Sequence, residues 1–311
     1  MLYSKLGNTG VKISKITLGS NNFGRQLDRQ QSYRVISKAL DLGVNSVDTA
    51  NVYTQGQSER IIGEYIRESR DSVFVASKVG MPLSSEVNYQ GLSRKHIQWQ
   101  LSQTLERLGT KYLDLYYLHR PDPETPILET MVLMDQLVKQ GKTLYVGCSN
   151  FSAEQMRELL RVCEENDLVK PVAVQPEYNL LERSAEKGLF DLCRSESLSV
   201  FTYSPLKGGA LTGKYAGASS PPPDTRASAN PRYWERIRSS DIPEKSRKLL
   251  EASKRIGIPL AQLSIAWILR NPAVSSAIVG ASTPMQVEEN CRSLELAVRD
   301  SDWGALEQAT L

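Results

Sequence analysis

The chain of 311 residues has few of the side chains that build metal centres and disulfide frameworks. It has two histidines, His96 and His119, no H-E-x-x-H motif, and no two cysteines spaced as C-x-x-C. A zinc site is therefore not expected, and neither is a secreted disulfide scaffold. We expect all four cysteines to be reduced thiols in the apolar core of a cytoplasmic protein: Cys148, Cys163, Cys193 and Cys291.

Long apolar runs and a strong charge of one sign are also absent. No stretch approaches the roughly 18 apolar residues of a membrane span, and residues 1–14 contain no apolar run typical of a signal peptide. Lys and Arg total 38 and Asp and Glu total 35, a formal net charge of +3 without a basic block. We expect a soluble cytoplasmic protein without a nucleic-acid or membrane partner.

What the sequence does contain is an eightfold alternation of short apolar runs with longer amphipathic patterns. The apolar runs are residues 15–20, 44–50, 73–79, 112–119, 143–149, 172–177, 199–205 and 275–281. Runs of this kind are typical of parallel strands covered by helices. The alternation predicts an α/β fold, a (β/α)8 or TIM barrel, as a single domain over residues 1–311. The competing doubly wound sheet usually carries G-x-G-x-x-G, but no two glycines here are two positions apart.

Two segments depart from the alternation. A β-hairpin is predicted around Gly7 and Gly10. A long irregular loop rich in Pro, Gly and Ser is predicted over residues 207–243, after the seventh barrel strand, where barrels often bind phosphate. Within it, GGALTGK (208–214) resembles a P-loop, but Tyr215 stands where the Mg²⁺-binding Ser or Thr would be, which argues against a P-loop nucleotidase.

Polar side chains end or follow the second to sixth strands: Asp48, Tyr53, Lys78, His119, Ser149, Asn150 and Gln175. The C-terminal ends of barrel strands share one face, which carries the active site. One such residue alone is most simply a cap or turn residue. A set on successive strands predicts an active site.

These motifs, in this order, resemble those of the aldo-keto reductase family. The matching segments are VNSVDTANVYTQGQSERIIGEYI (44–66), VFVASKVG (73–80), YLDLYYLHRPDP (112–123), GKTLYVGCSNFS (141–152), VAVQPEYNLLER (172–183), VFTYSPLKGGALTGKY (200–215) and AIVGASTPMQVEEN (277–290). TRAS (225–228) and GASTPMQVEEN (280–290) are similar to the branch of bacterial reductases that resemble potassium-channel β subunits. The resemblance implies NADPH-dependent reduction of an aldehyde or ketone, a small carbonyl substrate, and a catalytic tetrad of Asp48, Tyr53, Lys78 and His119.

The chemistry of carbonyl reduction suits these residue types. Tyr53 would supply the proton for the developing alkoxide, although a free Tyr has a pKa of about 10. The ammonium of Lys78 at ~4 Å favours the phenolate by roughly 4 kcal/mol, enough to lower that pKa by about three. Asp48 would keep Lys78 charged, and His119 would orient the carbonyl oxygen. The alternatives are a packed aromatic at Tyr53, a structural Lys78–Asp48 ion pair and a core histidine.

The same resemblance implies a cofactor site for NADPH. The residues at its nicotinamide end would be Gly19, Ser20, Asn21, Asp48, Ser149, Asn150, Gln175 and Tyr203. The pyrophosphate would lie against Ser204, Pro205, Leu206, Gly208, Gly209, Lys214 and Arg226. The adenosine end would lie against Gly280, Ser282, Gln286, Glu289 and Asn290. Many family members have an Arg for the 2′-phosphate where this chain has Gln286, although the channel-β-like branch has Gln too.

Two functions remain open at this point. One is a working reductase, and the other is a nucleotide-sensing regulatory subunit that keeps the barrel and binds a partner protein. Channel β subunits tend to replace the His of the tetrad with Asn, whereas this chain keeps His119. Substrate specificity is expected in the loops 22–30, 81–91 and 207–243, with Tyr89, Trp99 and Trp234 as exposed candidates and core packing as an equal alternative for Trp99. The sequence makes no prediction of the substrate or the oligomeric state.

Overall fold

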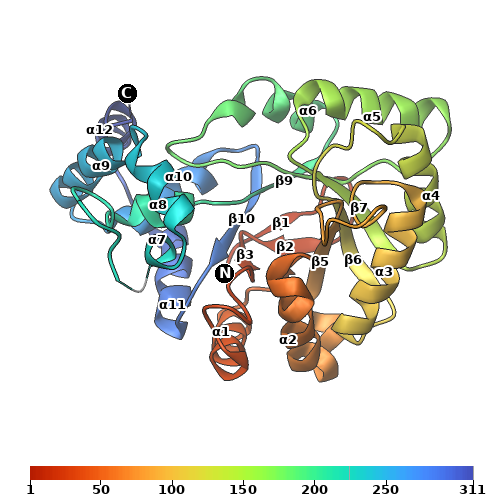
Figure 1. Cartoon of the computed structure of the whole chain (residues 1–311). Helices are drawn as coiled ribbons and strands as arrows, with labels where there is room; N and C mark the ends of the chain where they lie inside the picture. Colours follow the sequence, from red (N-terminus) through yellow and green to blue (C-terminus); the bar gives the residue numbers. More distant parts are fainter. Residues whose placement is uncertain (224, 311) are drawn as a thin grey trace.

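The predicted eight-stranded parallel barrel is present. The computed structural model describes residues 1–223 and 225–310, and for Arg226 and Ala229 it describes the backbone only. The strands close in the order β10-β3-β4-β5-β6-β7-β8-β9 (Figure 1). They are β3 (Ile16–Gly19), β4 (Ser46–Asp48), β5 (Phe74–Val79), β6 (Leu113–Leu118), β7 (Thr143–Ser149), β8 (Ala173–Gln175), β9 (Ser199–Thr202) and β10 (Val274–Gly280). Each lies within or overlaps one of the eight apolar runs, so the fold class is confirmed.

Helices surround the barrel and bury its outer surface (Figure 1). They are α1 (Arg29–Asp41), α2 (Gln57–Ile66), α3 (Arg94–Leu108), α4 (Ile127–Lys139), α5 (Ala153–Glu165), α6 (Leu189–Ser195), α10 (Leu260–Arg270) and α11 (Pro284–Arg292). Farther out, α9 (Ile242–Ile256) packs on α10, and α12 (Asp300–Gln308) packs on α9 (Figure 1). Local sequence sets their ends. Ser152 and Gln155 form a capping box at the start of α5, and Gly109 ends α3 in a left-handed conformation.

The predicted N-terminal hairpin fills one end of the barrel. It consists of β1 (Tyr3–Lys5) and β2 (Lys12–Ser14). Leu6 and Ile13 are buried against side chains that point into the barrel, among them Phe74 and Tyr117. The backbone N–H of Gly7 donates to Ser199 Oγ at 2.6 Å. The hairpin thus closes the N-terminal end, and the carboxyl ends of the strands form the opposite, polar end.

The segment 207–243 is more regular than the sequence predicted. It contains η4 (Lys207–Thr212), α7 (Arg226–Ala229), α8 (Pro231–Arg238) and the first residues of α9. Asn230 caps α8, and Pro231 opens it. Ala210, Tyr215, Tyr233, Trp234 and Ile237 belong to a separate buried cluster. The expectation of an exposed Trp234 is wrong because this cluster leaves only 9% of it accessible, whereas Trp99 is 40% exposed.

The structure also describes the helices, the possible metal ligands and the cysteines. Across residues 1–223 and 225–310, none of the helices has both the length and the apolar character of a membrane span. In the same part of the chain, no group of three or more His, Cys, Asp or Glu side chains is placed to hold a metal ion. All four cysteines are free thiols, with Cys291 half-buried and the other three buried.

Candidate active site

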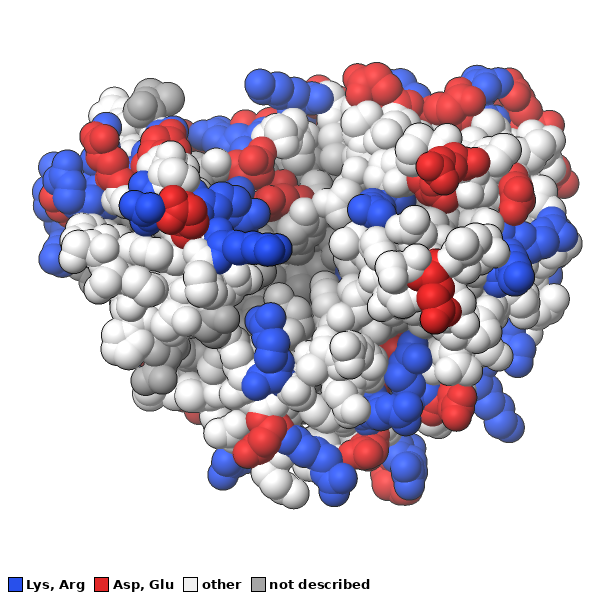
Figure 2. Space-filling view, viewed as in Figure 1, with Lys and Arg blue, Asp and Glu red and all other residues white. Residues whose placement is uncertain are grey.

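A cavity of about 510 Å³ opens at the carboxyl ends of the strands. Figure 2 shows this face of the molecule hollowed near its middle, with Lys and Arg side chains at the rim of the hollow. Most of the residues expected at the site line the cavity: Gly19, Ser20, Asn21, Asp48, Tyr53, Tyr203, Ser204, Pro205, Leu206, Gly208, Gly209, Lys214, Gly280, Ser282, Gln286, Glu289 and Asn290. Segments far apart in the sequence therefore meet at one site.

The remaining expected residues lie elsewhere. The lining does not include Lys78, His119, Ser149, Asn150 and Gln175. The side chain of Arg226 is outside the described part of the chain, so its predicted role stays a prediction.

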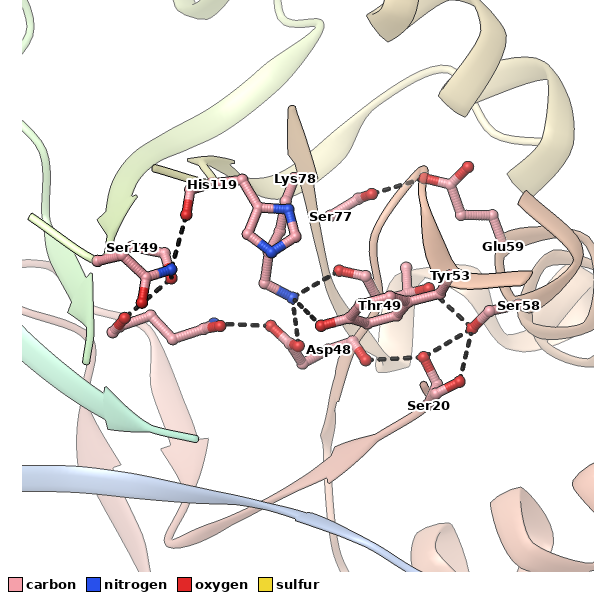
Figure 3. Close-up of polar contacts among 12 residues, drawn as sticks. Ser20, Asp48, Thr49, Tyr53, Ser58, Glu59, Ser77, Lys78, His119 and Ser149 are labelled. Atoms are coloured by element: carbon pink, nitrogen blue, oxygen red, sulfur yellow. Dashed lines mark hydrogen bonds and ion pairs between the residues drawn. The ribbon is translucent and has the colours of Figure 1, made fainter. Parts of the chain in front are cut away.

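Lys78 is a fully buried ammonium at the centre of the candidate tetrad (Figure 3). Its Nζ donates to Asp48 Oδ1 at 2.5 Å, to the Thr49 carbonyl at 2.8 Å and to Tyr53 Oη at 3.3 Å. Alternation along β5 explains this position, because Phe74 and Ala76 also point into the barrel, four and two residues before Lys78. One ammonium therefore links the carboxylate of β4 to the phenol of the loop that follows β4.

The electrostatics of this pair favour the charged state. Burial opposes the charge on Lys78, but the Asp48 carboxylate and Tyr53 outweigh that effect and raise the pKa of the lysine. Gln175 Nε2 donates to the other oxygen, Asp48 Oδ2, at 2.8 Å. Both carboxylate oxygens thus have a donor, and Lys78 remains a cation beside the Tyr53 hydroxyl.

His119 lies next to this cluster as a neutral imidazole. Burial, with further contributions from Lys78 and Arg120, lowers its pKa to about 3. Its ring stands edge-on to that of Tyr53, with centroids 6.3 Å apart and planes at 82°. The Nδ1 atom is buried without a hydrogen-bond partner in the described structure. Near neutral pH His119 can therefore donate a hydrogen bond, but it is not an acid that carries a spare proton.

Tyr53 is held by an unusual turn. It begins η1 (Tyr53–Gly56), in which Thr54 and Gln55 have φ of 49° and 53° and Gly56 has φ of 84°. Left-handed non-glycine residues cost about 1–3 kcal/mol each and persist where their surroundings fix them. Here Thr54 Oγ1 donates to the Phe23 carbonyl at 3.0 Å. The strained backbone thus directly follows Tyr53, which carries the candidate proton donor.

Ser149, Asn150 and Gln175 form a hydrogen-bonded layer beside the cavity. Ser149 Oγ donates to the Gln175 carbonyl at 2.9 Å, and Asn150 Nδ2 donates to the His119 carbonyl at 2.8 Å. Tyr203 Oη, from a residue that does line the cavity, donates to Asn150 Oδ1 at 2.7 Å. The layer thus connects Tyr203 to the tetrad, and a role in binding the carboxamide of a nicotinamide stays a prediction.

Sequence reasoning did not single out several lining residues, namely Asn22, Gln26, Thr212, Ala261, Ile278, Val279 and Ala281, although the first three lie in the loops 22–30 and 207–243 expected to carry specificity. Asn22 carried a signal, because it directly follows the predicted Ser20 and Asn21. Its Nδ2 donates to the Ala281 carbonyl at 2.9 Å, and its buried Oδ1 has no partner in the described structure. Ala261 of α10 carried none, because a small residue at the start of a helix is common.

The order of these elements agrees with a known family. The model described as the aldo/keto reductase family matches residues 15–310. The chain belongs to the aldo/keto reductase family. Members generally use NAD(P)H, and membership supports an oxidoreductase.

Relatives of this aldo/keto reductase include proteins named as channel subunits. A probable voltage-gated potassium channel subunit beta of Oryza sativa subsp. japonica is 38% identical over 95% of this chain and 92% of the relative. One of Arabidopsis thaliana is 37% identical over the same shares. A putative one of Schizosaccharomyces pombe is 36% identical over 93% of this chain and 87% of the relative. The similarity thus runs along almost the whole chain.

Proposed function

We propose that this protein is an NADPH-dependent reductase that converts aldehydes or ketones to alcohols. The observation that carries the proposal is the buried Lys78 ammonium, which is hydrogen-bonded to the Asp48 carboxylate and to the Tyr53 hydroxyl at once. A lysine shared in this way keeps its charge and stabilises a phenolate, so Tyr53 can release a proton to an alkoxide.

The cavity suits a dinucleotide. A Cβ atom at Gly208 would overlap Tyr233, and one at Gly209 would overlap Lys214, so only glycine fits at these two positions of the cavity lining. Lys214 lines the cavity, and no carboxylate in the described part of the chain pairs with it, which favours an anionic group such as a pyrophosphate. The buried, unpartnered Asn22 Oδ1 leaves an acceptor for a donor on the ligand. When bound, a reduced nicotinamide would supply the hydride.

The protein's own residues then complete the reaction at the carbonyl group. His119, as a neutral donor, orients the carbonyl oxygen, and Tyr53 gives that oxygen its proton as the carbon receives the hydride. Lys78 stabilises the phenolate left on Tyr53, and Asp48 holds Lys78 in place. The product is an alcohol, and the phenolate recovers a proton from solvent.

A second candidate function is a nucleotide-sensing regulatory subunit, which the names of the channel-subunit relatives favour. The two candidates differ at His119. A sensor needs only a bound nucleotide and a partner protein, whereas a reductase needs the complete tetrad. Because His119 is present beside Tyr53, the reductase is the better supported candidate.

The deciding experiment is the loss of absorbance at 340 nm when the purified protein is mixed with NADPH and a panel of aldehydes and ketones that includes 4-nitrobenzaldehyde. We expect turnover by the parent protein and none above background by Tyr53→Phe. Absence of turnover across the panel, with NADPH binding intact, would favour the sensor.

A further inference from the structure

Two polar residues in the first turn of α2, which directly follows the Tyr53 turn, are fully buried. They are Ser58 and Glu59, and each makes contacts outside its own helix (Figure 3). We propose that Ser58 and Glu59 are positioning residues that hold Tyr53 in register with Lys78 and Asp48. The proposal rests on the reductase function above and names two residues of that site which do not themselves contact the cavity.

Glu59 joins the Tyr53 turn to the strand that carries Lys78. Its Oε1 accepts from Ser77 Oγ at 2.6 Å. Ser77 directly precedes Lys78 on β5, and because side chains alternate along a strand, Ser77 points out to α2 while Lys78 points into the barrel. The Glu59 carboxylate therefore attaches α2 to β5 at Ser77, the residue next to Lys78.

The other oxygen of Glu59 holds a side chain that packs over the turn. Oε2 accepts from Arg107 Nε of α3 at 2.6 Å. A Cβ atom built on Gly56 would lie 2.5 Å from Arg107 Cδ, so the arginine stem rests directly on the last residue of the Tyr53 turn. Because Gly56 has no side chain, Arg107 can pack directly on its backbone, which follows Thr54 and Gln55.

Ser58 makes the matching connection to Asp48. Its Oγ lies 2.8 Å from Ser20 Oγ and 2.9 Å from Thr49 Oγ1. Ser20 Oγ in turn donates to the Asp48 carbonyl at 2.8 Å, and the Thr49 carbonyl accepts from Lys78 Nζ. Ser58 thus connects the Tyr53 turn to β4, which carries Asp48, and Glu59 connects the turn to β5, which carries Lys78.

A purely structural role is a competing explanation, and the chain offers a matched control for it. Arg70 and Asp114 form another largely buried ion pair, with Nη2 and Oδ2 2.8 Å apart. This pair also binds β5 and its neighbour β6, because Asp114 accepts from the Val75 N–H at 2.9 Å. Val75 lies near the start of β5, so the control pair sits at the end of the strand opposite Lys78.

The first test compares Glu59→Gln with Asp114→Asn in the full-length protein. We expect Glu59→Gln to lower kcat about 100-fold, the scale of a misplacement of about 1 Å, and to leave the NADPH dissociation constant within about twofold. Asp114→Asn should lose comparable stability in denaturant unfolding and keep kcat within about twofold. Equal losses of kcat in the two variants would overturn the proposal, and so would parent-like kcat in Glu59→Gln.

A second variant guards against a Glu59→Gln protein that does not fold. Ser77→Ala keeps the Glu59–Arg107 pair and removes only the link to the Lys78 strand. We expect kcat to fall several-fold at unchanged NADPH affinity, and parent-like kcat would contradict the role given to that link.

A crystal structure separates this inference from the proposed function, because it needs no turnover. In whichever of the two variants folds, the Tyr53 Oη–Lys78 Nζ separation should exceed that of the parent protein, and it should be unchanged in Asp114→Asn. An unmoved Tyr53 would overturn the positioning role. A parent protein that reduces no carbonyl, combined with a displaced Tyr53 in the variant, would reject the reductase and keep the positioning role.

Discussion

At the residue scale, the molecule is organised around one buried cation. Lys78 is fully buried, yet it keeps a raised pKa because a carboxylate and a phenol surround its Nζ. Removing one partner of a buried ion pair is strongly destabilising, because the other charge is left buried without a partner. The consequences of this arrangement can be measured one side chain at a time.

Lys78→Met should abolish reduction and leave NADPH binding nearly unchanged. The variant keeps the bulk of the side chain and removes the charge that stabilises the Tyr53 phenolate, so we expect kcat to fall about 1,000-fold or more. The measurements are steady-state kinetics and titration of NADPH fluorescence. Lys214→Met is the control, because Lys214 lines the cavity and makes no hydrogen bond or ion pair with the tetrad in the described structure. This variant should weaken NADPH binding and change kcat less. Turnover close to that of the parent in Lys78→Met would contradict the role of the ammonium.

His119 gives the protein a specific response to acid. Its pKa of about 3 in the native state lies below the value of about 6.5 expected in the unfolded chain. Above pH 6.5 the imidazole is neutral in both states. As the pH falls from 6.5 toward 3, only the unfolded chain gains the proton, so the free energy of unfolding decreases.

His119→Asn should therefore lose less stability than the parent between pH 7 and pH 4. The difference should reach at most about 3 kcal/mol, because the side chain is partly exposed. Urea unfolding of the cofactor-free protein at the two pH values measures it. Equal losses in the two proteins would show that His119 takes up a proton in the native state.

At the scale of elements, the glycines of η4 shape the floor of the cavity. Gly208 has φ of 62°, and a Cβ atom there would overlap the ring of Tyr233. Tyr233 Oη also donates to the Gly208 carbonyl at 3.0 Å, so α8 packs on this glycine. We expect the contact to set the shape of the pyrophosphate end.

Gly208→Ala should weaken NADPH binding about tenfold or more, whereas Gly217→Ala should change it less than twofold. Both residues have positive φ, and nothing lies within 4 Å of a Cβ atom at Gly217. The comparison therefore removes the backbone strain common to both and isolates the collision with Tyr233. Calorimetric titration with NADPH gives the two affinities. Similar weakening in both variants would mean that strain, and not the shape of the cavity, sets the affinity.

The sequence predicted the elements better than the contacts between them. All eight strands were visible, because each is a nearly continuous apolar run that is buried on both faces. The helices of 207–243 were hidden among Pro, Gly and Ser, and Trp234 was misjudged because its burial depends on Tyr215, 19 residues earlier in the chain. The positioning role proposed for Glu59 was equally hidden, since its partners Ser77 and Arg107 come from two later elements.

At the scale of the whole molecule, the two ends of the barrel have separate tasks. The N-terminal end is packed with apolar side chains around Leu6 and Ile13, and the C-terminal end carries the cavity and the tetrad. Barrels commonly separate stability from function in this way. A change at the packed end should therefore affect unfolding and leave catalysis alone.

Leu6→Ala should lower the free energy of unfolding by about 2–5 kcal/mol and leave kcat within about twofold. The loss follows from an apolar cavity in a packed core. Leu2→Ala, at a position that is 57% exposed, should cost less than about 0.5 kcal/mol. Denaturant unfolding with parallel assays measures both quantities. A large fall in kcat for Leu6→Ala under folding conditions would show that the two ends are coupled.

The hairpin that fills the N-terminal end also determines from which end of the barrel ligands can enter. With that end filled, a nucleotide and a carbonyl compound bound as proposed would both reach Tyr53 from the carboxyl ends of the strands. A carbonyl compound bound first would block the way in. The reactants should therefore arrive in a fixed sequence, nucleotide before carbonyl compound, and the alcohol should depart before the oxidised nucleotide.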